Sequence, residues 1–298
     1  MERQADRSYD QLIGRFVRWA ESCSDIRAAV IVGSRARVHL PADEWSDLDV
    51  VMVTTNPEHY VSTRYWLSSI GNLLLTFVEP TSTGDEMERR ALFENMLDVD
   101  FAVIPAGKVK LMLQSGIPSQ EMAQFADTFG RGIRVLLDKD GLTARLKELV
   151  SSIKKPVSEP PTQKEFLQVV NDFLYHAVFT AKHLRRGELW WAKMTSDCYM
   201  QRLLLRLIEW HAHVLHGWDY DTWFRGRFLE KWADPRILEL LHGAFAHYDQ
   251  ADTKRGLQAV LDLFRTVAVE ISEELKYSYP IESDRQVSEW IGKCILEK

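Results

Sequence analysis

The chain has 298 residues, of which 46% are hydrophobic and 27% are charged, and its formal net charge is -6 at pH 7. This length and composition are typical of a folded protein with room for two ordinary domains. The slightly acidic charge and the lack of an extended basic stretch argue against a nucleic-acid partner.

The amino-terminal segment predicts a packing helix rather than a targeting signal. Apolar residues recur at helical spacing between residues 9 and 23, and no apolar stretch in the chain approaches the ~18 residues that span a membrane. The three cysteines, Cys23, Cys198 and Cys294, are scattered without C-x-x-C spacing and suggest neither disulfides nor a thiolate metal site. We therefore expect a cytoplasmic protein with no membrane partner, and no obligate protein partner is evident.

Five short strands are expected in the first half of the chain. Their residues are mostly apolar and β-branched, and polar or turn-forming segments separate them. The expected ranges are 28–32, 48–53, 73–78, 90–94 and 99–104. Strands mixed with helices in this way predict an α+β domain, with a mixed sheet flanked by helices.

A proline-rich stretch marks a domain boundary. Residues 154–162 read KKPVSEPPT, a composition that suits neither a helix nor a paired strand. Directly after it, Thr162 is a predicted N-cap, and Glu165 completes a capping box. The pattern stays helical from there to the end, so we expect two domains, 1–153 and 154–298, the second an α-helical bundle.

Two carboxylates precede the second expected strand. Asp47 and Asp49 are one residue apart, so on a strand they point to the same face. Such neighbouring charges repel each other and are costly to desolvate, but a pair of Mg²⁺ ions would neutralise them, since carboxylates are the hard ligands that Mg²⁺ prefers. Asp100 heads another expected strand and is the predicted third ligand of a two-metal site.

The turn before these carboxylates predicts a phosphate site. Gly33 ends the first expected strand, and a glycine there lets backbone amides approach a phosphate closely. The Ser34 hydroxyl adds a donor, and Arg35 or Arg37 is expected to add a charge-assisted bond.

These motifs resemble those of a known group of enzymes. The segments GSRAR, SDLDVVMV and DVDFAVIP are similar to the active-site signature of nucleotidyltransferases related to DNA polymerase β. A longer series follows in the order typical of aminoglycoside 6-adenylyltransferases, the streptomycin-modifying enzymes. The series is LFENMLDVDFAVIP, RVLLDKDG, PTQKEFLQVVNDF, AKHLRRGELWWA, LLLRLIEWH and GRFLEKW. The resemblance covers about residues 31 to 232.

The resemblance implies an activity. It implies transfer of AMP from the co-substrate ATP, with Mg²⁺, to a hydroxyl group of a streptomycin-like aminoglycoside, and hence antibiotic resistance. It also implies that Asp47, Asp49 and Asp100 hold the metal and that Gly33 and Ser34 hold phosphate. Lys182 matches a lysine that binds the triphosphate in related enzymes. Its alternative interpretation is one charge on a solvated helix face.

The sequence identifies the residues that contact the acceptor substrate less clearly than the metal ligands. A general base must take the proton of the acceptor hydroxyl, and we favour Asp100 for this role. Other carboxylates are candidates for the base or for contacts with a cationic substrate, and Asp172 is the favoured substrate contact. These candidates are Glu79, Glu94, Asp98, Asp172 and Asp197.

Two other functions fit the same motifs. The acceptor could be another small hydroxylated molecule, or a protein side chain as in toxin-type nucleotidyltransferases, although those chains generally lack a long helical half. A catalytically silent nucleotide-binding protein would not need all three carboxylates. The neighbouring histidines His211, His213 and His216 are interpreted as packing or surface residues, because positions two apart on a helix do not share a face.

Overall fold

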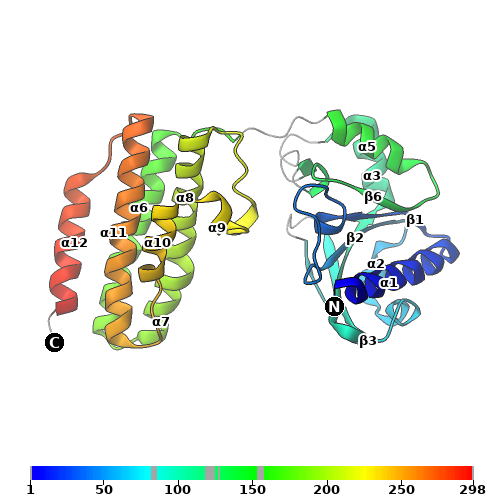
Figure 1. Ribbon diagram of the computed structural model, residues 1–298, viewed down its shortest axis with the longest axis horizontal. Coiled ribbons are helices and arrows are strands. Elements are labelled where there is room, and N and C mark those ends of the chain that lie inside the picture. The colour runs from blue at the N-terminus through cyan, green and yellow to red at the C-terminus, as the bar shows by residue number, and fades with distance from the viewer. Residues whose placement is uncertain (1, 82–85, 118–124, 127, 153–157, 297–298) are drawn as a thin grey trace. The chain divides into compact units, whose positions relative to one another are not determined.

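The computed structural model describes residues 2–81, 86–117, 125–126, 128–152 and 158–296. The chain forms two compact units, Met1–Pro156 and Val157–Lys298 (Figure 1). The expected boundary between residues 153 and 154 falls outside the described residues. Among the helices of the described part, none combines the length and the apolar composition needed to cross a bilayer.

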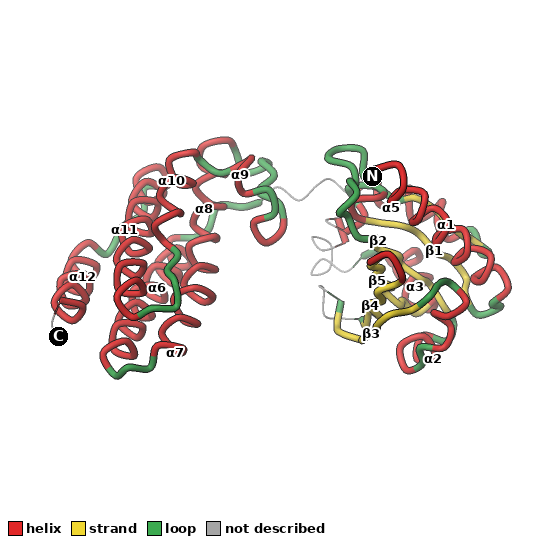
Figure 2. Tube along the Cα trace, turned by 60° about the horizontal axis from the view of Figure 1, so that its bottom comes forward, coloured by secondary structure: helices red, strands yellow, loops and turns green. Residues whose placement is uncertain are grey.

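A six-stranded sheet forms the centre of the first unit (Figure 2). Its strands are β1 Ile26–Val32, β2 Leu48–Thr54, β3 Leu73–Pro80, β4 Met87–Phe93, β5 Leu97–Pro105 and β6 Arg134–Asp138. The order is β3-β4-β5-β2-β1-β6; β2 and β5 are parallel, and all other neighbours are antiparallel. The mixed sheet and its five expected strands are confirmed.

Two details of the strands differ from the prediction. The edge strand β6 was not expected. The fourth strand covers Met87–Phe93 rather than residues 90–94, because Glu94 begins a 3-10 turn, η3 Glu94–Met96, in which Asn95 has a positive φ of 64°.

Helices cover both faces of the sheet, as Figure 1 shows. These helices are α1 Glu2–Ser22, α2 Pro57–Ser62, α3 Ala106–Ser115 and α5 Leu142–Ser152. Alternate residues of β2 point to opposite faces. Val50 and Met52 join the core beneath α1 and α2, whereas Val53 packs with residues of α3 and α5. Asp49 lies four positions before Val53 on β2, so its side chain points to the same face of the sheet, the one covered by α3 and α5.

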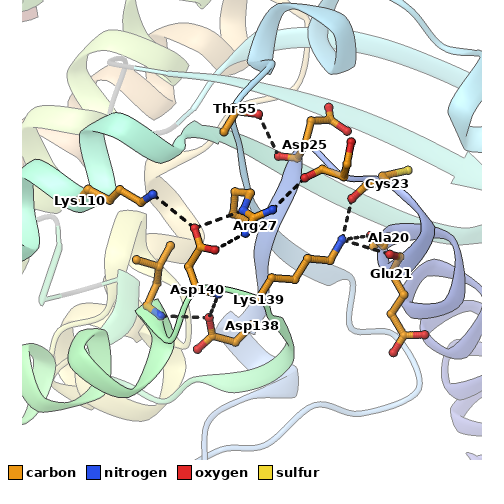
Figure 3. A network of polar contacts seen from close by, with 12 residues as sticks. Ala20, Glu21, Cys23, Asp25, Arg27, Thr55, Lys110, Asp138, Lys139 and Asp140 are labelled. Atoms are coloured by element: carbon orange, nitrogen blue, oxygen red, sulfur yellow. Dashed lines mark hydrogen bonds and ion pairs between the residues drawn. The ribbon is translucent and has the colours of Figure 1, made fainter.

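A polar network fastens the end of α1 to the sheet (Figure 3). The ammonium group of Lys139 donates to the carbonyl oxygens of Ala20 and Cys23 at 3.0 and 2.6 Å. Both carbonyl groups lie at or just after the end of α1, where a cationic side chain is favourable. Arg27 of β1 forms an ion pair with Asp140, two residues after the end of β6. The network thus ties α1, β1 and β6 together.

The second unit is a helical bundle, as expected. Its elements are α6 Gln163–Arg185, α7 Leu189–Met194, the π-helix η4 Thr195–Met200, α8 Gln201–His216, the 3-10 helix η5 Phe224–Gly226, α9 Leu229–Trp232, α10 Pro235–Ala244, α11 Gln250–Leu275 and α12 Ile281–Leu296. The predicted capping box is confirmed: Glu165 N donates to Thr162 Oγ1 at 3.2 Å, and Thr162 N donates to the Glu165 carboxylate at 2.7 Å. In the core, the rings of Phe173 and Phe264 stack with centroids 3.6 Å apart.

Candidate active site

The parallel pairing of β2 with β5 brings the three predicted carboxylates together. Asp49 lies directly opposite Asp100 in the register of these strands, and Asp47 precedes β2 by one residue. One ligand oxygen from each of Asp47, Asp49 and Asp100 lies within 4.8 Å of the others, and all three residues are half-buried. Among the described residues, this is the one group of three side chains able to share a metal ion.

The strand β4, next to β5, supplies one positive charge and one further carboxylate, and β3 supplies another carboxylate. The Arg90 guanidinium lies 2.8 Å from Asp100 and 2.9 Å from Glu88, and it also pairs with Glu79. Burial nevertheless raises the pKa of Asp100 to about 6, because desolvation outweighs the attraction of Arg90 and nearby carboxylates add repulsion. Burial also raises the pKa of Glu88. Such a concentration of half-buried negative charge fits a bound cation.

The turn after β1 lies against the same carboxylates. Gly33 begins the 3-10 helix η1 Gly33–Arg35 with a φ of 66°, which favours glycine. A β-carbon at Gly33 would lie 2.2 Å from Asp49 Oδ2, so only a glycine lets the backbone come this close.

Ser34 has a hydroxyl group that the fold does not satisfy. The residue is 4% exposed, and its Oγ has no hydrogen-bond partner among the described residues. Buried hydroxyl groups are nearly always hydrogen-bonded, so this one fits a ligand oxygen. A phosphate oxygen bound beside the carboxylates would supply that partner.

Arg35 was predicted to bind phosphate, but in the structure its guanidinium contacts other parts of the protein. Its guanidinium donates to the carbonyl oxygens of Ser46 and Asp47 at 2.8 and 2.9 Å. Its central carbon lies 3.7 Å from the ring centroid of Tyr9. The alternative candidate Arg37 donates to the carbonyl oxygen of Leu40. A role of Arg35 in binding nucleotide stays a prediction.

The other predicted binding residues have partners of their own. In the first unit, Glu79 on β3 pairs with Arg90. Lys182 lies in the helical unit, on the exposed side of α6, where its ammonium is 5.9 Å from the ring centroid of Trp290.

Asp172 and Asp197 also lie in the helical unit, each with separate partners. The Asp172 carboxylate accepts a 2.9 Å hydrogen bond from Tyr199 and lies 2.8 Å from Nδ1 of His176. Asp197, in the π-helix, pairs with Lys193 at 2.5 Å, and its Oδ1 is buried with no partner among the described residues. Their roles in substrate binding stay predictions.

The histidines of α8 do not form a ligand set. His211 is buried and its Nε2 lies 2.8 Å from Glu270, while the His213 ring stacks on Trp218 with centroids 5.2 Å apart. His216 is exposed. The interpretation of these histidines as packing and surface residues is confirmed.

Sequence reasoning did not identify Arg90, Glu88 or Tyr9 as neighbours of the site. Arg90 lies opposite Asp100 only because β4 and β5 pair in one particular register. Glu88 lies outside the expected strand 90–94 and joins Arg90 only on the observed strand β4, where residues two apart point to one face. The three carboxylate candidates came from strand ends, where the sequence signal is strongest.

Comparisons with known proteins agree along nearly the whole chain. The family model described as streptomycin adenylyltransferase matches residues 6–294. An aminoglycoside 6-adenylyltransferase of Campylobacter jejuni is 22% identical over 297 residues, covering 96% of this chain and 95% of the relative. Proteins of the same name from Staphylococcus aureus and Bacillus subtilis are each 23% identical, covering 92% of this chain and 94% and 93% of the relatives.

A solved structure is also similar over most of its length. The crystal structure of an aminoglycoside 6-adenyltransferase from Bacillus subtilis is 20% identical, with a TM-score of 0.46, and the match covers 95% of this chain and 97% of that one.

Proposed function

The chain belongs to the streptomycin adenylyltransferase family and is a nucleotidyltransferase; from this premise we propose that it transfers AMP from Mg-ATP to a hydroxyl group of a streptomycin-like aminoglycoside. Its biological role is then resistance to the antibiotic. The cytoplasm is the proposed location, in keeping with three cysteines that are free thiols.

One observation carries the proposal: three carboxylates from two adjacent strands lie beside a turn with an unsatisfied hydroxyl group. The ligand oxygens of Asp47, Asp49 and Asp100 lie within 4.8 Å, which suits hard divalent cations. Ser34, which follows the Gly33 that lies against Asp49, adds a buried hydroxyl group with no partner among the described residues. Cation ligands and a phosphate donor in one place are what a nucleoside triphosphate needs.

We propose that Asp47, Asp49 and Asp100 hold two Mg²⁺ ions. When bound, such ions neutralise the triphosphate and stabilise the charge that develops at the reacting phosphate. The residues fit the ions chemically, because carboxylate oxygens are preferred ligands and Arg90 offsets only part of the local negative charge.

The chain's own groups then orient the reactants. The Gly33–Ser34 turn holds phosphate oxygens through its backbone amides and the Ser34 hydroxyl, which fixes the α-phosphate for in-line attack. The acceptor oxygen forms a bond to the α-phosphorus, and the bond to pyrophosphate breaks. A carboxylate oxygen of Asp100 takes the proton of the acceptor hydroxyl.

Further residues are proposed to bind the two substrates. Lys182 contributes a cation to nucleotide binding. Asp172, Glu79 and Asp197 are proposed to bind guanidinium or ammonium groups of the acceptor. In support of this proposal, Glu79 and Asp197 each already pair with a cationic side chain, and Asp172 lies 2.8 Å from Nδ1 of His176.

The proposal is tested by incubating the protein with ATP, MgCl₂ and streptomycin. We expect pyrophosphate release that depends on the drug and an adenylylated drug in the mass spectrum. The variant Asp49→Asn keeps the shape of the side chain but removes its charge, and we expect it to fold and to have no turnover. If a panel of aminoglycosides is left unmodified while labelled AMP appears on another small molecule or on protein, the assigned acceptor is wrong.

A further inference from the structure

We propose that Arg35 and Tyr9 form a brace that holds Asp47 and Asp100 in place and thereby sets the affinity of the site for divalent cations. The inference rests on the proposed metal site. It makes Arg35 a positioning residue rather than a nucleotide ligand.

The first half of the brace holds the loop that carries Asp47. This residue lies one position before β2 and outside the paired register of the sheet, so strand pairing does not fix it. The Arg35 guanidinium donates to the carbonyl oxygens of Asp47 and of Ser46 at 2.9 and 2.8 Å. An arginine with its flat, charged fork makes both bonds at once, which fixes the direction of the backbone there.

The second half of the brace runs from Arg35 to the strand of Asp100. The guanidinium carbon of Arg35 lies 3.7 Å from the ring centroid of Tyr9, a cation–π contact. Tyr9 is 3% exposed, and its hydroxyl donates to Asp98 Oδ1 at 2.9 Å. Asp98 lies on β5, two residues before Asp100. Burial raises the pKa of Tyr9, so the phenol stays protonated and remains a donor.

The brace thus joins the two chain segments from which the metal ligands come. Three carboxylates within 4.8 Å repel one another in the absence of a cation, and repulsion moves the least supported of them first. Asp47 is that carboxylate, because it lies outside the sheet. Holding its backbone in advance lowers the cost of assembling the ligands around an ion.

The experiment measures Mn²⁺ binding to the full-length, metal-free protein, without nucleotide, from the electron paramagnetic resonance signal of the free ion. Arg35→Lys keeps the charge and loses the paired hydrogen bonds, and we expect about a tenfold weaker affinity, the scale typical of residues that orient metal ligands. Tyr9→Phe keeps the ring under the guanidinium and removes only the hydroxyl group. A smaller loss in the same direction is expected for it.

Arg27→Lys is the matched control. Arg27 also donates to a backbone carbonyl oxygen, that of Ser24, and pairs with Asp140 (Figure 3). It lies near the start of β1, whereas Gly33 follows the end of that strand. The Mn²⁺ affinity of Arg27→Lys should equal that of the unchanged protein. Far-UV circular dichroism of each variant verifies that the fold is retained.

Asp49→Asn separates the brace from the metal site on which it rests. If Asp49→Asn binds Mn²⁺ as tightly as the unchanged protein, the proposed metal site is wrong, and the brace fails with it. If Asp49→Asn loses the ion while Arg35→Lys keeps full Mn²⁺ affinity and only raises the KM for ATP, the metal site stands and Arg35 is a nucleotide ligand, which overturns the brace. Weaker binding in Asp49→Asn, Arg35→Lys and Tyr9→Phe, with Arg27→Lys unchanged, supports it.

Discussion

Gly33 has little freedom to change. Its φ of 66° is in the left-handed region, and a β-carbon would lie 2.2 Å from Asp49 Oδ2. We expect Gly33→Ala to displace the Asp49 carboxylate and to abolish both Mn²⁺ binding and turnover, with strain of about 1 kcal/mol at the turn itself. The control is Gly107→Ala on α3, where a β-carbon meets nothing within 4 Å. Activity of Gly33→Ala near that of the control would contradict the close approach.

We expect Glu209 on α8 to make the stability of the folded protein depend on pH. Burial raises the pKa of Glu209 from 4.5 to about 7, partly offset by Arg206. The folded state therefore keeps a proton that the unfolded state loses, so this contribution to stability is full below pH 4.5 and is lost as the pH rises towards 7. Glu209→Gln should avoid the loss, and we expect it to be on the order of 2 kcal/mol more stable than the unchanged protein at pH 8.

Urea unfolding followed by tryptophan fluorescence at pH 4.5 and pH 8 measures this difference. Most of the tryptophans lie in the helical unit with Glu209. The matched variant is Glu239→Gln, since Glu239 is exposed on α10. An equal advantage of Glu209→Gln at both pH values would mean that the carboxyl group is not the source of the effect.

The residues of the site differ in how far sequence alone predicts them. Asp47 and Asp49 stand at the start of β2, and Asp100 lies within β5; each precedes an apolar run, where a charge is conspicuous. The contacts of Arg35 depend on the path of the loop between η1 and β2, for which periodicity gives no information. The same is true of Arg90, whose pairing with Asp100 is set by strand register.

At the scale of elements, apolar runs predicted five strands, including β3 at one edge of the sheet, but missed β6 at the other edge. The strands β1 and β2 are buried on both sides, and their apolar residues form nearly continuous runs, whereas buried residues alternate with more exposed ones along β5. The edge strand β6 has only five residues, none of them fully buried, and its pairing with β1 is a long-range contact. The pattern of apolar residues within a short segment does not predict a strand such as β6, which is stabilised mainly by pairing with a strand distant in the sequence.

The start of α6 gives a prediction for an element. Thr162 and Glu165 exchange hydrogen bonds that satisfy amide groups at the helix start. We expect Thr162→Ala to lower the stability of the helical unit by about 1 kcal/mol, as measured by urea unfolding. Thr266→Ala, at an exposed position inside α11, should not destabilise the unit, because alanine is the better helix former there. Equal effects of the two changes would contradict a capping role.

At the scale of the molecule, each unit has a core of its own. The core of the helical unit draws its buried residues from positions 166 to 291, and the largest core of the first unit draws them from positions 9 to 103. All three carboxylates and the Gly33–Ser34 turn belong to the first unit. Folding of the helices and binding of the metal should therefore be separable.

This separation can be tested with fragments of the chain. Residues 158–298 alone should give a helical circular dichroism spectrum and a cooperative thermal transition, and should not bind Mn²⁺ at the affinity of the full chain. A shorter fragment that ends before α12 is the control. It loses the ion pair between Arg265 and the buried Asp284, together with the fully buried Ile291. Removing these contacts uncovers apolar core and leaves Arg265 with only its ion pair to Asp262, so the shorter fragment should melt at a clearly lower temperature. An unfolded 158–298 fragment would show that the helices need the first unit to fold.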